Sequence, residues 1–230
     1  KNNLFIMKFS TKSALIGFMS AVSVFFVWQN VAFATFGYGG GSTVTPDTTT
    51  GAVTVSTSTP EVVVSSSTQP VNVTISSGTT NPVINVSSFI SSVVVGTTTV
   101  KQGTLPAISI LSADISNLTV AIPASTVVTS ASTTWDGKIA APTVTSVTLP
   151  TESGQTKVLG TAIEVGFVGA ELTFDKAVKI VLPGQAGKKV GYTRNGGTTF
   201  TEITATCSGN DQTTGNALSA GAECKIDSAS

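Results

Sequence analysis

Regular alternation of apolar and polar residues is the feature that most limits how this chain can fold. In Val71 to Ile75, apolar side chains occupy every second position, which is the period of a strand with one buried face. Leu118 to Ile122 and Val178 to Leu182 follow the same pattern. After Trp28 we find no convincing apolar period of about 3.6 residues, the mark of an amphipathic helix. The sequence therefore predicts an all-β fold.

Composition and spacing refine this prediction. Ser, Thr, Val and Gly predominate and only 10% of the residues are charged, a mixture that favours extended strands. Strand-like segments recur about every eight to twelve residues with turn residues between them, which predicts an antiparallel β-sandwich. A closed up-and-down barrel is the alternative. Asn195-Gly196-Gly197, between Val190 and Ala205, predicts the turn of a hairpin.

Four segments are expected along the chain. Residues 1–34 form an export signal, residues 35–51 a flexible leader rich in Gly and Thr, residues 52–104 a β-stalk or small β-unit rich in Thr, Ser and Val, and residues 105–230 the β-sandwich module. The leader has too little apolar surface to offset the entropy cost of ordering it. Residues 52–104 contain few aromatic and charged side chains, so we expect a thin core there.

The first segment has the pattern of a secretory signal peptide. Lys8 and Lys12 precede an apolar run from Ala14 to Trp28, and Ala32 and Ala34 are the small residues that a signal peptidase reads. We expect a signal helix that is cleaved before Thr35, and a secreted or cell-surface location. An uncleaved segment that tethers the protein to a membrane is the alternative, but the run is shorter than the roughly 20 apolar residues that a spanning helix needs.

Two cysteines, Cys207 and Cys224, lie 17 positions apart and enclose a polar segment. In an exported protein, an even number of cysteines predicts a disulfide. A reactive thiol is the alternative, but the chain contains no histidine to activate it.

Charge and residue content argue against several function classes. Three of the 12 basic residues lie in residues 1–34. The rest of the chain therefore has 9 basic and 12 acidic residues, and its net charge is −3. Nucleic-acid binding requires clustered Lys and Arg, and we do not expect it. The missing histidine removes the usual general base and the commonest zinc ligand. We expect no enzymatic activity and assign no catalytic, cofactor or metal residues.

Two sets of side chains are candidates for a catalytic or sugar-binding site, and each also has a simpler structural interpretation. Glu171 and Asp175 resemble an acid and base pair, but four residues of strand span about 13 Å, more than the roughly 5 to 9.5 Å that glycoside hydrolysis uses. Turn and solubility roles are favoured for both carboxylates. Trp135 and Tyr192, with Phe200, are candidate ligand-stacking residues for a sugar, and core packing is the favoured alternative for Trp135 and Phe200.

Three residues, Asp136, Asn210 and Asp211, offer oxygen ligands of the type that calcium prefers. Their spacing does not match the D-x-[DN]-x-[DN]-G pattern of a calcium loop. The sequence therefore does not predict a calcium site.

Between about Leu105 and Ser230, four motifs precede or overlap the region of the cysteine pair: LTVAIPASTVVTS at 118–130, STTWDGKIAAPT at 132–143, ELTFDKAVKIVLPG at 171–184 and KKVGYTRNGGTTFTEI at 188–203. With the two cysteines, this order resembles modules of secreted bacterial surface proteins, which are themselves similar to the β-sandwich ZU-type domain of ankyrins and netrin receptors. It implies an extracellular structural or interaction module without catalytic residues. It also implies a further strand after the cysteines, so we expect the module to be truncated at Ser230.

These observations predict a non-catalytic, exported structural or adhesion protein. Its expected partners are a cell-surface glycan or protein, or another copy of the chain through β-sheet edges. Contact with a membrane is expected only through an uncleaved signal segment. The alternative function is an accessory, carbohydrate-binding region of a larger secreted enzyme.

Overall fold

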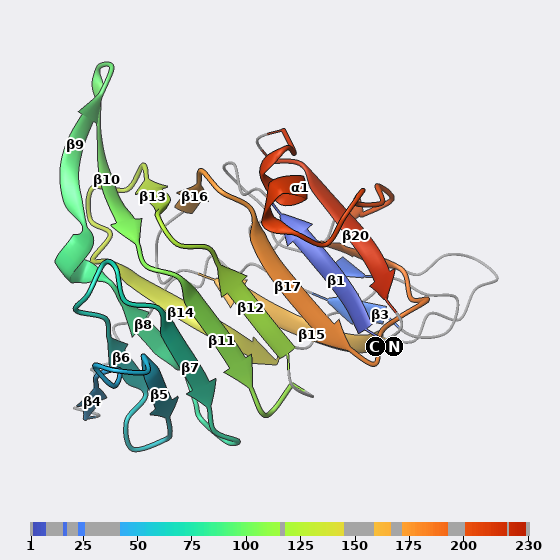
Figure 1. Ribbon diagram of the computed structural model, residues 1–230, viewed down its shortest axis with the longest axis horizontal. Coiled ribbons are helices and arrows are strands. Elements are labelled where there is room, and N and C mark those ends of the chain that lie inside the picture. The colour runs from blue at the N-terminus through green and yellow to red at the C-terminus, as the bar shows by residue number, and fades with distance from the viewer. Residues whose placement is uncertain are drawn as a thin grey trace.

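The structure, a computed structural model, describes residues 2–7, 16–17, 23–25, 42–115, 118–144, 159–166, 172–192, 201–219 and 221–228. Most of these residues lie in strands of three sheets (Figure 1), so the all-β prediction is confirmed. The seven-stranded sheet has the order β20 (Glu223–Ser228), β1 (Asn2–Met7), β17 (Val178–Pro183), β12 (Leu118–Ile122), β11 (Ile108–Ser112), β7 (Val71–Ile75) and β5 (Ala52–Val55). The nine-stranded sheet has the order β19 (Thr201–Glu202), β18 (Val190–Tyr192), β2 (Ile16–Gly17), β3 (Ser23–Phe25), β15 (Leu159–Gly166), β14 (Lys138–Val144), β8 (Val83–Asn85), β6 (Glu61–Val63) and β4 (Thr43–Val44). The four-stranded sheet has the order β16 (Leu172–Phe174), β13 (Thr126–Ser130), β10 (Thr98–Leu105) and β9 (Ser91–Val95).

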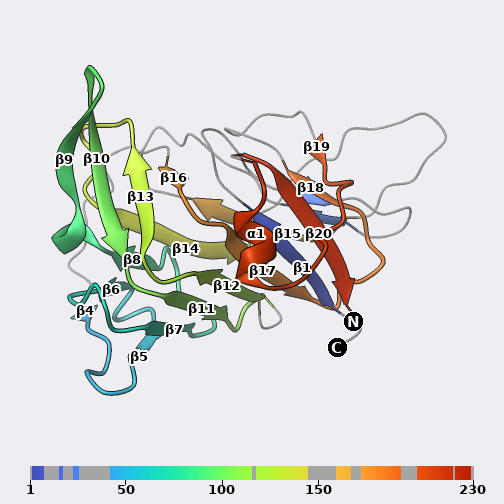
Figure 2. The ribbon, with the colours of Figure 1, turned by 45° about the horizontal axis from the view of Figure 1, so that its top comes forward.

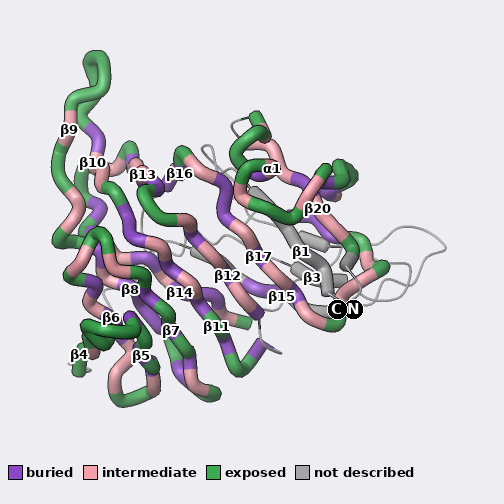
Figure 3. Tube along the Cα trace, viewed as in Figure 1, coloured by how far each residue is buried: buried purple, intermediate pink, exposed green. Residues whose placement is uncertain are grey.

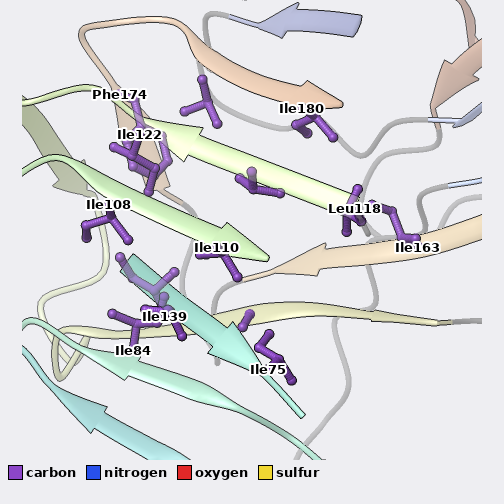
Figure 4. Packing of buried hydrophobic residues seen from close by; sticks show 14 of the residues in the cluster. Ile75, Ile84, Ile108, Ile110, Leu118, Ile122, Ile139, Ile163, Phe174 and Ile180 are labelled. Atoms are coloured by element: carbon purple, nitrogen blue, oxygen red, sulfur yellow. The ribbon is translucent and has the colours of Figure 1, made fainter. Parts of the chain in front are cut away.

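The two larger sheets face each other as a sandwich, and Figure 2 shows them as separate layers. Their inner faces bury one continuous set of apolar side chains, which Figure 4 shows between the layers. Among the described strands each sheet has two edges, so the sandwich prediction is confirmed and the closed barrel is not what the chain forms. The pairing is mixed and not antiparallel throughout as expected, because β4, β6 and β8 pair parallel, as do β5, β7 and β11. The expected pairing of the hairpin strands is also found, because β18 pairs antiparallel with β19, whereas the expected turn at 195–197 lies outside the described residues.

The expected signal helix is not confirmed. Within residues 1–34 the structure describes three short strands: β1 pairs with both β17 and β20, while β2 and β3 join the nine-stranded sheet. The expected cleavage residues Ala32, Ala34 and Thr35 lie outside the described residues. Among the residues that the structure describes, no helix is long and apolar enough to cross a membrane.

Residues 43–85 form a parallel coil, in which the chain passes alternately between the two large sheets. β4, β6 and β8 are parallel neighbours in one sheet, and β5 and β7 are parallel neighbours in the other. In register, Thr43 lies beside Glu61 and Glu61 beside Val83, so successive turns of the coil differ in length. Unequal turns explain why the sequence shows no fixed repeat. The coil also includes Thr43–Val44, which the sequence assigned to the leader.

The coil continues into the rest of the sandwich through shared ladders of buried residues. β7 pairs with β11 and β8 pairs with β14, across the segment boundary expected at 104/105. One buried ladder crosses the seven-stranded sheet in register: Val53, Val73, Ile110, Val120 and Ile180. Buried β-branched side chains pack well on such a pleated surface. The thin core expected for residues 52–104 is therefore part of one larger core.

The four-stranded sheet continues the seven-stranded sheet beyond a bend. The chain crosses the bend three times, each time through a short connection between a strand of one sheet and a strand of the other. Pro106-Ala107 joins β10 to β11, residues 123–125 join β12 to β13, and residues 175–177 join β16 to β17. Proline removes a backbone donor and interrupts the ladder. The bend carries strands β9 and β10 away from the sandwich as a projecting hairpin (Figure 1).

Candidate functional site

A hollow of about 510 Å³ lies where β7, β11 and β14 end. Its lining is mixed, with apolar floor residues such as Ile75 and Ile115 and a rim rich in hydroxyl, amide and carboxylate groups. The rim includes the exposed residues Thr80, Asn81 and Asp114 and the half-buried Thr143, and the buried Thr79 also lines the hollow. Ligand sites commonly have volumes of roughly 300 to 1,000 Å³ with a few placed polar groups.

Asp114 holds one wall of this hollow in place. Its carboxylate accepts hydrogen bonds from the Ser77 hydroxyl and from the Gly78 backbone N–H, the latter at 2.8 Å. The Thr79 hydroxyl donates to the Ser76 carbonyl at 2.6 Å. These bonds fix the turn after β7, so the rim is preformed by local contacts.

The candidate stacking residues Trp135 and Tyr192 lie in the hydrophobic core. They are 4% and 6% exposed, and the Trp135 indole N–H donates to the Lys138 carbonyl at 3.1 Å. Gly137, two residues after Trp135, has φ of +82° and packs closely on Ser87. A Cβ at position 137 would lie only 2.5 Å from the Cα of Ser87. A sugar stacks on an exposed ring face, whereas these two rings contribute to packing.

A polar cluster of Glu61, Asn85 and Lys138 joins three adjacent strands of the nine-stranded sheet. The Asn85 side-chain amide donates to Glu61 Oε1 at 2.7 Å, and Lys138 Nζ lies 3.4 Å from Glu61 Oε2. Glu61 is buried, so its carboxylate depends on these partners for solvation. These bonds connect strands β6 and β8 of the coil to β14. We therefore assign the cluster a structural role. Sequence reasoning did not single out these residues, because their positions along the chain are far apart.

Asp175 serves the bend between β16 and β17. Its Oδ1 accepts a hydrogen bond from the Val127 N–H at 2.7 Å, and the neighbouring Lys176 Nζ donates to the Ala124 carbonyl at 2.7 Å. Both hydrogen bonds connect the segment between β16 and β17 to the neighbouring residues 124–127 at the bend. Glu171, the other half of the candidate carboxylate pair, lies outside the described residues. The contacts of Asp175 agree with the turn role that its spacing favoured.

Two of the three candidate calcium ligands, Asp136 and Asp211, have local roles in the structure. Asp136 Oδ1 accepts from the Lys138 N–H at 3.2 Å. Asp211 Oδ1 accepts from the Thr214 N–H at 2.8 Å and caps the short helix α1 (Gln212–Asn216). The backbone N–H and hydroxyl of Thr214 hold the pKa of Asp211 below its ordinary value. Among the described residues, no group of three or more His, Cys, Asp and Glu side chains could hold a metal ion.

Cys207 and Cys224 form the predicted disulfide, with their Cα atoms 5.0 Å apart. They pack with Ala177 in a small second cluster, separate from the main core. Helix α1 lies in the enclosed segment, and its Gln212 and Asn216 side chains bond the carbonyl and N–H of Ala177 at 3.0 and 3.1 Å. The sequence prediction missed this helix. Asp211 followed by Thr214 is the capping signal that points to it.

Comparisons of this chain with family models, with curated protein sequences and with solved structures gave no match.

Proposed function

We propose that this protein is an exported, non-catalytic structural and adhesion module of the cell surface or extracellular space. The disulfide between Cys207 and Cys224 carries the proposal, because such bonds persist mainly in oxidising compartments. The small residues Ala32 and Ala34 after an apolar run supply the route of export. The long, two-layered β-body fits a spacer that carries a binding surface.

The hollow beside Asp114 supports the adhesion part of the proposal. Its hydroxyl, amide and carboxylate rim offers both donors and acceptors, which is the chemistry that sugar hydroxyls require. Its volume suits a ligand the size of one or two sugar rings. We assign a cell-surface glycan as the ligand class.

Export is tested by expressing the full chain in a bacterial host and sequencing the amino terminus of the protein in each fraction. The expected product begins at Thr35 and is found in the envelope or medium. Ala34→Tyr should block processing because the peptidase reads a small residue there, whereas Ala34→Ser should be processed normally. Unprocessed wild-type protein confined to the cytoplasm would defeat the export part.

Processing at this position has a structural consequence. β1 lies between β17 and β20 in the seven-stranded sheet, so its removal separates these two strands. β20 then stays attached through the Cys207–Cys224 bond, the backbone bonds of Lys225 with Ala205 and Cys207, and the bond of the Asp227 carboxylate with the Gly187 N–H. Loss of the disulfide is therefore expected to loosen β20 more in the mature protein than in the full chain.

Glycan binding is tested by applying the exported protein to immobilised glycans and whole cells. Thr143→Trp fills the hollow and is expected to reduce retention at least about tenfold. Thr133→Trp, at an exposed position outside the lining, is the matched control. Equal retention of the two variants would remove the hollow from the proposal, and retention only on protein ligands would replace the glycan.

A further inference from the structure

We propose that strand β9 is a homotypic interface, through which two copies of this chain join their four-stranded sheets edge to edge. The strand belongs to the hairpin of β9 and β10, which extends beyond the sandwich (Figure 1). β10 pairs with β9 on one side and with β13 on the other, whereas β9 has one neighbour among the described strands and forms the edge of this sheet. An unpaired edge presents backbone donors and acceptors to another strand.

The side chains of β9 are accessible. None of its five residues is buried, and Val94 and Val95 are 68% and 55% exposed. Figure 3 shows the hairpin tip and much of β9 as exposed. Large β-branched side chains at such exposure gain from pairing with a second pleated strand.

Comparison with the other edges shows why β9 is the one suited to pairing. Proteins protect edge strands by charge, proline or shortness. In the described sheets, β4, β16 and β19 have two or three residues, and β20 carries Glu223, Lys225 and Asp227. β5 has four residues, and two of its side chains are already buried. β9 is five residues long and has no charged residue and no proline. Removal of residues 1–34 would take away β1, β2 and β3. It would expose β17, which carries Lys179 and Pro183, β15, which carries Glu164, and β18, which has three residues.

The partner is assigned as a second copy because β9 has no charged residue that would repel its own copy. An antiparallel pair about a two-fold axis places each strand opposite its own sequence, and like charges directly opposite would destabilise it. Residues 81–100 contain no charge, so no like charges lie opposite one another along this edge when two copies pair.

The hairpin turn predicts the centre of the pair. Val95 and Thr98 flank a two-residue turn in which Gly96 has φ of +63°, as a type II′ turn requires. Backbone bonding alternates along an antiparallel ladder, so Ser92 and Val94 direct their N–H and C=O groups away from β10. A two-fold axis at Val93 pairs these outward groups with each other. It also places Val93 opposite its own copy.

Sedimentation velocity of the full chain at about 1 µM to about 100 µM tests this inference. The range suits the weak affinity expected of a contact made by one five-residue strand from each copy. We expect a monomer–dimer equilibrium. Val94→Lys should raise the dissociation constant at least about tenfold, because the two lysines would be diagonal neighbours about 7 to 8 Å apart on one face of the joined sheet and would place like charges together. Val144→Lys is the matched control, since Val144 is 60% exposed and lies on an inner strand.

Disulfide trapping provides the second measurement. The two natural cysteines are bonded to each other, so Val93→Cys introduces a single free thiol. Mild oxidation should link Val93→Cys into dimers and leave Val144→Cys mostly monomeric. A wild-type monomer at the highest concentration, a dimer insensitive to Val94→Lys, or equal crosslinking of the two cysteine variants would each overturn the inference. The proposed function does not depend on this interface, and an exported, glycan-binding monomer would overturn the interface alone.

Discussion

The parallel coil of residues 43–85 and the carboxyl-terminal segment of residues 201–228 reach stability by different means. The coil places buried valines and isoleucines on both large sheets, and each turn of the coil packs on the next. The carboxyl-terminal segment contributes Ile203 to the main core, while Cys207 and Cys224 form a separate cluster with Ala177. A segment with little apolar surface to bury gains more from a covalent link, which restricts its unfolded state.

The largest effect is expected from a cavity in the coil. Ile84 is fully buried and in register between Val62 and Ile139. Ile84→Ala should lower the free energy of unfolding by about 2 to 5 kcal/mol, because the lost methyl groups leave a void between the sheets. Chemical denaturation measures this change. Val94→Ala, at an exposed site, should change it by less than about 0.5 kcal/mol, and similar losses in the two variants would contradict the packing account.

A somewhat smaller and more local effect is expected from loss of the disulfide. Replacing Cys207 and Cys224 together by alanine should cost about 3 kcal/mol by the chain-entropy estimate for a loop of this size. Hydrogen exchange should show faster exchange of β20 amides, while β7 amides keep their protection. Equal acceleration in both strands would show that the two regions unfold as one unit, and would remove the contrast between them.

The smallest effect is expected from acid. Asp47 in the coil and Asp211 before α1 each have a lowered pKa: the Thr50 backbone N–H bonds the first and the Thr214 backbone N–H the second. A carboxylate with a lowered folded-state pKa contributes stability above its unfolded pKa, and that contribution is lost as pH falls through the folded pKa. NMR titration should therefore show both carboxylates titrating below ordinary aspartates.

Asparagine variants separate the role of charge from the role of capping. Asp211→Asn retains a side-chain acceptor for α1 but should abolish the local acid dependence of its amide signals. Asp47→Asn is the matched variant in the coil, where Oδ1 accepts from the N–H groups of Thr49 and Thr50 at 2.9 and 2.7 Å. An acid dependence of α1 that persists in Asp211→Asn would assign the effect to another group.

Much of the fold followed from local patterns, and the exceptions share a physical reason. The alternation in Val71 to Ile75 predicted a strand whose alternate residues are buried. It did not predict that β7 lies between two parallel neighbours, because parallel and antiparallel strands share the same side-chain period. Helix α1 was missed because five polar residues show no apolar period.

The candidate sites were less predictable than the fold. The pairing of Cys207 with Cys224 required no structure, since the sequence contains only these two cysteines. The burial of Tyr192 depends on strands from other parts of the chain. The hollow beside Asp114 is formed by the ends of three strands that are distant in the sequence.

The sequence by itself determined the strands with strict alternation, such as Val71–Ile75, Leu118–Ile122 and Val178–Leu182, the buried faces of those strands, and which cysteines pair. Each of these follows from side-chain chemistry along a short stretch of chain. The tertiary structure decided which strands are neighbours, where the sheet bends, and that β9 is left as an uncharged edge. Strand pairing uses backbone N–H and C=O groups that nearly every residue carries, so the choice of partner depends on how the whole core packs.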